Sequence, residues 1–309
     1  MKVSIVVPVY NSGKYIERCL DSILDSLGKT DGEILAIDNN STDNSVKILK
    51  QYAKEHPAVK VLSCKTPGAS AARNYGTKQA KGDYLWFVDS DDTIDKKAIR
   101  KLLKCAKKNQ ADFVMLGMKR IYPDGHEDYL YAINPKDTDA KHCFVRYGLG
   151  PMQVFSRRAW WSKHFKFREG IIHEDMELMS TLILHTDNFA AVDKPLYYYY
   201  QNDGSVLHQK QWNPHAFDIF PALESLYKHF EDAKALNEFH ADIEWFFIWN
   251  LLLDSAKDFG AFPEGKPGFA RSRAMLKKYF PNWRESRFFR EKPFKLYLRV
   301  LLNYYGLHK

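Results

Sequence analysis

The sequence predicts an α/β protein: a doubly wound, mostly parallel sheet followed by a C-terminal helical extension. Apolar runs of strand length alternate with helical patterns as far as about residue 120, which is the order of β-α-β units. From Pro214 onward helical patterns follow one another without a strand between them. We therefore expect one domain over residues 1–210 and a helical extension over residues 211–309.

Val3–Val9 is a continuous apolar run, as expected of a strand covered by helices on both faces, and Tyr84–Val88 is strongly apolar. The expected strands are Val3–Val9, Glu33–Asp38, Val59–Ser63, Tyr84–Val88 and Asp112–Met118. The helices expected between them are Lys14–Leu27, a segment from Ser41 to Ala53, Ser70–Ala80 and Asp95–Lys108.

After residue 118 the pattern changes. A hairpin is expected over Lys119–Ile133 around Pro123–Gly125, because Pro, Asp and Gly favour turns. A helix is expected at Glu174–Leu184, and two strands at Phe189–Val192 and Leu196–Gln201. The extension is predicted to hold helices at Phe217–Phe230, Ile243–Phe259, Ala270–Tyr279 and Phe294–Tyr305.

Composition excludes several classes of protein. The chain has 309 residues, is 45% hydrophobic and carries a net charge of +8, which is ordinary for a globular protein. The apolar runs are all shorter than the roughly 20 residues that span a bilayer. The four cysteines are scattered without a Cys-x-x-Cys pair, so we expect neither a zinc site nor a disulfide framework. We expect no signal peptide and a cytoplasmic location.

Polar clusters follow three of the predicted strands at their carboxyl ends, where open parallel sheets bind ligands. They are Tyr10–Gly13, Asp38–Ser41 and Asp89–Asp92, and we expect them to border one cleft. The third cluster places three carboxylates within four residues. Their repulsion calls for a counter-charge, and Mg2+ or Mn2+ bridging to a diphosphate would supply it. The alternative is a set of helix caps before Asp95.

Further side chains in the sequence are candidates for binding a nucleotide and for acting as a general base. Asp38 could accept the N3–H of uracil, or cap a turn; Tyr10 could stack on the base, or pack internally. The small-residue helix start Gly68–Asn74 favours an anion, and its Arg73 could pair with phosphate or form a structural ion pair. In His173–Asp175, either acid could take a proton from an acceptor hydroxyl or could cap the helix.

Together these segments resemble the family 2 glycosyltransferases, which have the GT-A fold. The matching stretches are Val3–Asn11, Ile37–Asp43, Gly68–Asn74, Gly82–Asp92 and Glu174–Asp175. Their order and spacing match as well, and the resemblance covers about residues 1–205. It implies an inverting, metal-dependent transfer of a hexose or N-acetylhexosamine from a UDP-sugar to a saccharide or lipid-linked saccharide.

The resemblance also implies roles for particular residues. Asp175 would be the catalytic base, and Asp91 would bind Mn2+ or Mg2+ with Asp89, which would also face the ribose and sugar. The uridine and sugar side would be lined by Pro8, Tyr10, Asn11, Asp38, Asn39, Arg73, Asp89, Ser90 and Glu174. The Tyr-rich strand Tyr197–Tyr200 and Ser205 fit the same pattern, and His208 would be a further metal or phosphate ligand. Asn39 departs from the family, in which a second acid is common at this position.

Other functions fit the sequence less well. A nucleotidyltransferase needs a Gly-rich, basic phosphate loop where Pro8–Gly13 stands. An oxidoreductase would show Gly-x-Gly-x-x-Gly, and a glycoside hydrolase needs no metal-diphosphate cluster. A non-catalytic member of the same fold, acting as a binding or scaffold subunit, stays open beside the enzyme.

The basic charge is concentrated at the C-terminus. Residues 265–309 hold 12 Lys and Arg against 2 Asp and Glu, whereas residues 1–264 hold 34 against 36. A basic, aromatic and amphipathic end over residues 283–309 favours an anionic membrane surface and a peripheral position on the inner face of the cell membrane. A helix packed on the protein with a solvated basic face is the alternative. Nucleic acid is not expected as a partner.

Overall fold

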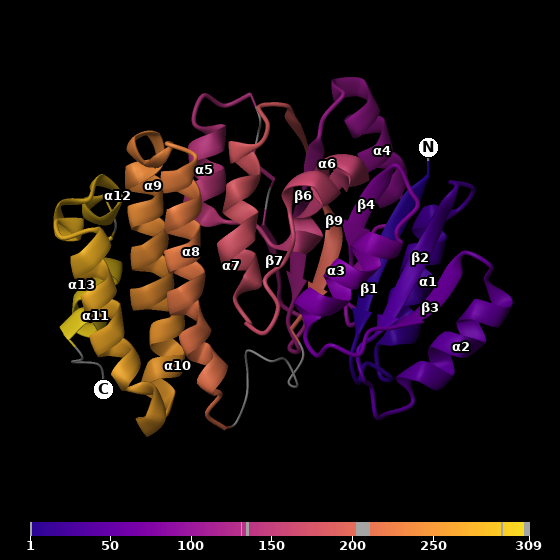
Figure 1. Ribbon diagram of the computed structural model, residues 1–309, viewed down its shortest axis with the longest axis horizontal. Coiled ribbons are helices and arrows are strands. Elements are labelled where there is room, and N and C mark those ends of the chain that lie inside the picture. The colour runs from indigo at the N-terminus through magenta and orange to yellow at the C-terminus, as the bar shows by residue number, and fades with distance from the viewer. Residues whose placement is uncertain (1, 131, 134–135, 202–210, 292, 306–309) are drawn as a thin grey trace. The chain divides into compact units, whose positions relative to one another are not determined.

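The computed structural model (Figure 1) describes residues 2–130, 132–133, 136–201, 211–291 and 293–305. The chain forms two compact units. The first, here called the sheet unit, comprises residues 1–140, 149–170 and 185–203, and the second, the helical unit, comprises residues 141–148, 171–184 and 204–309. Two short segments before residue 210, 141–148 and 171–184, belong to the helical unit as well. The expected domain boundary at residue 210 stays a prediction.

The sheet unit is built on one mixed sheet with the strand order β3-β2-β1-β4-β8-β6-β9-β5, and β7 pairs with β6. The strands are β1 (Val3–Val9), β2 (Gly32–Asp38), β3 (Val59–Ser63), β4 (Tyr84–Phe87), β5 (Thr93–Ile94), β6 (Phe113–Ile121), β7 (Glu127–Leu130), β8 (Val154–Arg157) and β9 (Phe189–Tyr200). The first four are parallel to one another, which confirms the predicted parallel core.

The register of these parallel strands brings their carboxyl ends to one edge. Val9 at the end of β1 lies opposite Asp38 at the end of β2, and Val6 lies opposite Phe87 at the end of β4. The loops that follow β1, β2 and β4 therefore leave the sheet side by side, as the strand pattern predicts.

Helices cover both faces of this parallel core. α1 (Ile16–Leu27), α2 (Ser45–Glu55) and α4 (Ala98–Asn109) share one buried cluster with the side chains of β1 that point to that face, such as Ile5 and Val7. α3 (Ala69–Gln79) approaches the opposite face so closely that a Cβ at Gly76 would overlap Val6. α6 (Arg158–His164) covers the same side, where Trp161 contacts Phe87. The sheet is thus doubly wound.

The part of the sheet beyond β4 is mixed, and it differs from the prediction in one strand. The predicted hairpin is present, because β6 pairs with β7 across a turn at Tyr122–Gly125. The two predicted strands after Phe189 are one continuous strand, β9. Pro195 in its middle lies opposite Gly117, where the β6–β9 register shifts. The irregularity accommodates the proline, which lies between the two predicted strands.

The helical unit is built mainly of α-helices. They are α5 (Ala140–Tyr147), α7 (Glu174–Leu178), α8 (Ile219–Asp232), α9 (Leu236–Trp249), α10 (Ser255–Ala261), α11 (Pro267–Tyr279), α12 (Arg287–Arg290) and α13 (Phe294–Tyr305). The predicted helix Ile243–Phe259 is divided by a π-helical turn at Asn250–Asp254, where the Asn250 amide donates to the Phe246 carbonyl at 2.8 Å. The predicted helix Glu174–Leu184 changes to a 3-10 helix at Met179.

A buried ion-pair group fixes part of the helical unit. Asp242 of α9 accepts hydrogen bonds from Arg146 at 2.9 Å and pairs with His142 at 2.6 Å, both from α5. The guanidinium of Arg146 also lies 3.7 Å from the ring centroid of Phe288. Among the residues that the structure describes, no helix is long and apolar enough to cross a membrane.

Candidate active site

The loops after β1, β2 and β4 are joined to one another by hydrogen bonds. The Oγ atoms of Ser12 and Ser90 are 2.6 Å apart, which connects the first loop to the acidic loop after β4. Asn11 has a positive φ of 48°, and its Oδ1 accepts from the Thr42 amide at 2.8 Å. Asn can adopt this left-handed conformation more readily than most residues. The predicted clusters therefore form one continuous rim at the carboxyl edge of the sheet.

The rim presents an aromatic ring and a carboxylate at the ends of β1 and β2. Tyr10 is 63% exposed. Asp38 is half-buried, and its Oδ1 accepts from the Ser41 amide at 3.1 Å. No described residue donates a hydrogen bond to Oδ2 of Asp38. Pro8 lies half-buried one residue before the end of β1. The open oxygen of Asp38 is an acceptor of the kind that a base N–H requires.

Asn39 holds the neighbouring loop together from inside. Its side-chain amide donates to the carbonyls of Cys64 at 3.0 Å and Thr66 at 2.7 Å. Its Oδ1 accepts from the Gly68 amide at 2.7 Å, and the residue is 6% exposed. Two of these partners are carbonyl oxygens, which require a donor. The amide that departs from the family pattern is therefore used to position the loop before α3.

The acidic loop after β4 sorts its three carboxylates into different environments. Asp89 is half-buried, and its Oδ1 accepts from the Arg73 guanidinium at 2.8 Å. Asp91 is also half-buried. Asp92 is fully buried, so it cannot reach a ligand at the rim. Asp89 and Asp91 are the two acids of the loop that stay accessible.

Asp92 attaches the acidic loop to the Tyr-rich strand β9. It accepts from the Tyr197 hydroxyl at 2.6 Å and from the Tyr200 amide at 2.9 Å. Burial raises the pKa of Asp92 well above its ordinary value, and the charges of Asp91 and Asp89 raise it further. The Tyr197 hydroxyl in turn accepts from the Asp89 amide at 3.1 Å. Burial and the neighbouring Asp92 raise the pKa of Tyr197, so it remains a neutral donor.

Arg73 is placed by the start of α3. Gly68, with a φ of 106°, turns the chain into the helix, and the following small residues let it lie close to the sheet. Arg73 is buried and lies with its guanidinium 5.5 Å from the Phe167 ring centroid. Its contact with Asp89 gives the structural ion pair that the sequence left as an alternative. The same cation also adds positive charge beside the acidic loop.

The structure adds Arg18, which the sequence did not single out. Its guanidinium lies 3.6 Å from the Tyr200 ring centroid and donates to the Asp91 carbonyl at 2.6 Å. It thus links α1 to both the acidic loop and the end of β9. Arg18 occupies an exposed helix position, where a basic residue is ordinary, so no sequence signal distinguished it.

The predicted base belongs to the helical unit. Asp175 is half-buried in the first turn of α7, and its Oδ1 accepts from the Met176 amide at 2.9 Å. Glu174 beside it is buried. Burial lowers the pKa of His173 below its ordinary value, although the charge of Asp175 acts in the other direction. His173 is therefore a neutral imidazole at neutral pH.

Oxygen atoms dominate the donor set available to a metal. Within the described part of the chain no group of three or more His, Cys, Asp and Glu could enclose a metal ion. His208 and Ser205 lie outside the described residues. Asp89 and Asp91 fit a different arrangement, in which one or two carboxylates share a hard cation with substrate phosphates. The residues present fit Mg2+ or Mn2+ held in this second way.

The comparisons with known proteins begin with a family model. The model of Glycosyl transferase family 2 matches residues 4–167. A poly(ribitol-phosphate) beta-glucosyltransferase of Bacillus spizizenii is 32% identical over an alignment of 235 residues, and the match covers 73% of this chain and 37% of that protein. This chain thus spans well under half the length of that relative.

Two solved structures share the fold. The crystal structure of S. aureus TarS residues 1–349 in complex with UDP-GlcNAc has a TM-score of 0.76 at 21% identity, and covers 98% of this chain and 89% of that one. A mannosyltransferase from Pyrobaculum calidifontis in complex with GDP-Man and Mn2+ has a TM-score of 0.54 at 16% identity, and covers 99% of this chain and 88% of that one.

Proposed function

We infer the function of this chain from the premise that it belongs to glycosyl transferase family 2. We propose that it transfers a hexose or N-acetylhexosamine from a UDP-sugar to a hydroxyl of a saccharide or lipid-linked saccharide, in the synthesis of a cell-surface glycan. One observation carries the proposal most strongly: the acidic loop after β4 keeps Asp89 and Asp91 accessible beside the rim that bears Tyr10 and Asp38.

The donor base would bind at the ends of β1 and β2. Asp38 has an oxygen without a donor among the described residues, which suits the N3–H of uracil. The exposed ring of Tyr10 supplies a face for stacking. Because Asn39 uses both amide hydrogens on backbone carbonyls, it would support this pocket from behind. A complex of TarS with UDP-GlcNAc supports the choice of a uridine donor.

The diphosphate would lie at the acidic loop. Asp91 and Asp89 would hold Mn2+ or Mg2+ there, and the cation would neutralise charge on the departing nucleoside diphosphate. Arg73 keeps the Asp89 carboxylate in one orientation through its 2.8 Å contact. Asp92 and Tyr197 anchor the loop, so Asp89 and Asp91 need not reorganise when the donor arrives. The mannosyltransferase solved with GDP-Man and Mn2+ supports this assignment.

Asp175 would take the proton from the acceptor hydroxyl as it attacks the anomeric carbon. Attack from the face opposite the diphosphate inverts the configuration in one step. The acceptor would be a hydroxyl of a glycan or glycan-bearing lipid. The glucosyltransferase of Bacillus spizizenii, named for poly(ribitol-phosphate), supports an acceptor of the cell surface.

The location follows from the acceptor and from charge. We propose a cytoplasmic protein that reaches the inner face of the cell membrane through the basic residues of 283–309. α13 is anchored to the helical unit, since Val300 is fully buried and the Asn303 amide donates to the Leu252 carbonyl at 2.7 Å. The same helix exposes Lys295, Leu298 and Arg299. A packed helix with an exposed basic side is compatible with a membrane surface.

The test is a panel of UDP-, GDP- and dTDP-sugars with Mn2+, followed by detection of free nucleoside diphosphate and product analysis on the best donor. Asp91→Asn should lose metal-dependent donor binding and turnover. Asp175→Asn should lose turnover and keep donor affinity. Asp25→Asn, at an exposed position of α1, is the matched control. A fully active Asp91→Asn variant would exclude the metal role, and the absence of any acceptor-dependent release would favour a scaffold.

A further inference from the structure

A pocket lies between α10 and α13 of the helical unit. Its volume is about 600 Å³, and it is lined by Ala256, Lys257, Gly260, Ala261, Lys295, Leu298, Arg299, Leu302 and Asn303. The small residues of α10 leave the space that the longer side chains of α13 border. This volume lies within the range of sites that hold small molecules.

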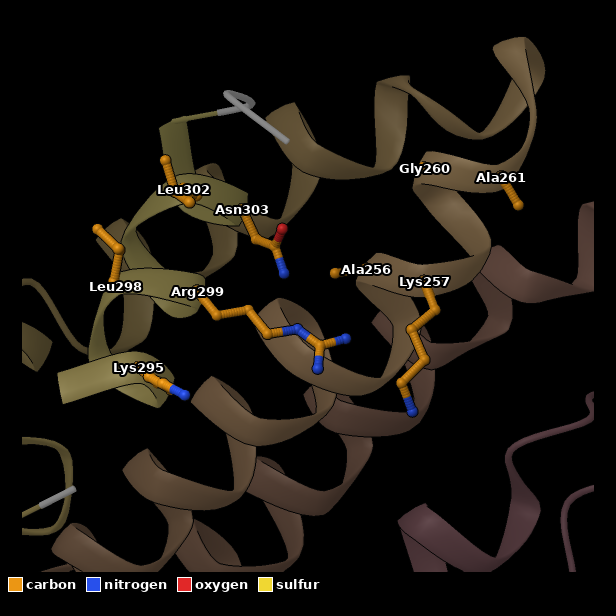
Figure 2. Close-up of a pocket in the computed structure, with 9 residues that line it drawn as sticks. All are labelled: Ala256, Lys257, Gly260, Ala261, Lys295, Leu298, Arg299, Leu302 and Asn303. Atoms are coloured by element: carbon orange, nitrogen blue, oxygen red, sulfur yellow. The ribbon is translucent and has the colours of Figure 1, made fainter. Parts of the chain in front are cut away.

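Three cations gather at this pocket from two helices. Figure 2 shows Arg299 extending from α13 toward α10, with Lys295 on the same helix and Lys257 on α10. Lys257 pairs with Asp254 at 3.0 Å. Neither Lys295 nor Arg299 has a carboxylate partner among the described residues. Like charges one helical turn apart destabilise a helix, so an external anion would relieve this arrangement.

The charge is not balanced from within α13. Residues 292–309 contain no Asp or Glu. Lys295 also stands in the first turn of α13, where the helix dipole disfavours a cation. Both features make the electrostatic free energy of these cations unfavourable, and a bound anion would lower it.

The same pocket has an apolar side. Leu298 is 43% exposed, Leu302 is partly exposed, and Ala256 and Ala261 of α10 also line the pocket. A free anion would use only the cations. An amphiphile with a phosphate head and a hydrocarbon chain would use both sides of the pocket.

We propose that the pocket between α10 and α13 binds the phosphate group of an anionic amphiphile, with Lys295 and Arg299 on the phosphate and Leu298 and Leu302 along its chain. The site belongs to the helical unit and requires neither the transfer reaction nor the acidic loop. A lipid headgroup and a free phosphate share the anion chemistry, and the apolar wall favours the lipid.

The test uses the full chain and three soluble probes: monomeric dihexanoyl phosphatidylglycerol, glycerol phosphate and dihexanoyl phosphatidylcholine. Calorimetry should show the first binding most tightly. The double variant Lys295→Ala, Arg299→Ala should lose about thirtyfold in affinity, as expected for two cations at an anionic surface. The matched control is Lys277→Ala, Arg290→Ala, which removes two exposed cations outside the pocket. Leu298→Asn should weaken the lipid and leave glycerol phosphate unchanged.

A second measurement needs no variant. Chemical acetylation of the native chain, followed by mass spectrometry, should show Lys295 protected by phosphatidylglycerol and Lys277 unprotected. Equal protection of both lysines, or equal loss of affinity in the control double variant, would reduce the effect to general electrostatics and overturn the site. Equal affinity for glycerol phosphate and phosphatidylglycerol would overturn the lipid and leave a simple anion site.

Discussion

Replacing Asn39 by Asp tests how this chain uses its departure from the family pattern. The substitution keeps the acceptor for the Gly68 amide and removes the two hydrogens donated to the carbonyls of Cys64 and Thr66. Each lost hydrogen bond costs about 1 kcal/mol. The new carboxylate would also face two carbonyl oxygens at a position that is 6% exposed. Ionised, it should bring the total loss to about 4 kcal/mol.

Protonation of the introduced carboxyl group should reduce the loss of stability, and this sets the direction of the pH dependence. The introduced carboxyl group, once protonated, can donate to one carbonyl, so its pKa in the folded state should lie above the unfolded value of about 3.9. A raised pKa of this kind gives stability that is present at low pH and is lost as pH rises through the folded value. We expect a loss of about 2–3 kcal/mol near pH 5 and about 4 kcal/mol near pH 8.

The assay is thermal unfolding of the variant and the parent protein at both pH values. A loss of about 3 kcal/mol should lower Tm by roughly 6–12 °C in a protein of this size. Asn237→Asp is the control, because Asn237 is exposed, its side chain donates to no described residue, and water can solvate a carboxylate there. An Asn39→Asp variant as stable as the parent would refute the stabilising role of the two hydrogen bonds that Asn39 donates. A loss that is equal at both pH values would refute the explanation by the carboxylate.

Three further predictions concern other buried or charged groups. Asp92→Ala should lower the unfolding free energy by about 2–3 kcal/mol in urea titrations, because Tyr197 and Tyr200 lose their acceptor; an unchanged midpoint would contradict this. Since burial lowers the pKa of His173, its contribution to stability is present above about pH 6.5 and is lost as pH falls below it. Unfolding midpoints near pH 5 and pH 7.5 should therefore differ more in the parent than in His173→Gln. Equal differences in the two proteins would refute the contribution of His173 to the pH dependence of stability. Chelating divalent metal should leave the Tm of the free chain unchanged and abolish the Tm rise caused by UDP-sugar, whereas a large fall in the free chain would indicate a structural metal.

The sequence predicts the parallel core and the edge that carries the rim, because both depend on local patterns. The strands β1, β2 and β4 are short, mainly apolar runs, and the polar clusters follow them directly in the chain. The role of Asp92 could not be predicted in this way. Its partner Tyr197 is 105 residues away, and only the pairing of β5 with β9 brings them together. The stacking of Arg18 on Tyr200 joins residues that lie even further apart in the sequence.

The charge of the acidic loop is balanced differently from what its sequence suggests. Three adjacent carboxylates call for strong compensation from outside. In the structure Arg73 pairs with Asp89, and burial together with the adjacent charges raises the pKa of Asp92 and so favours its neutral form. Much of the repulsion is therefore relieved by the protein itself. A cation bound at Asp91 would then serve the diphosphate more than the fold, which is why metal removal should affect donor binding and leave the stability of the free chain unchanged.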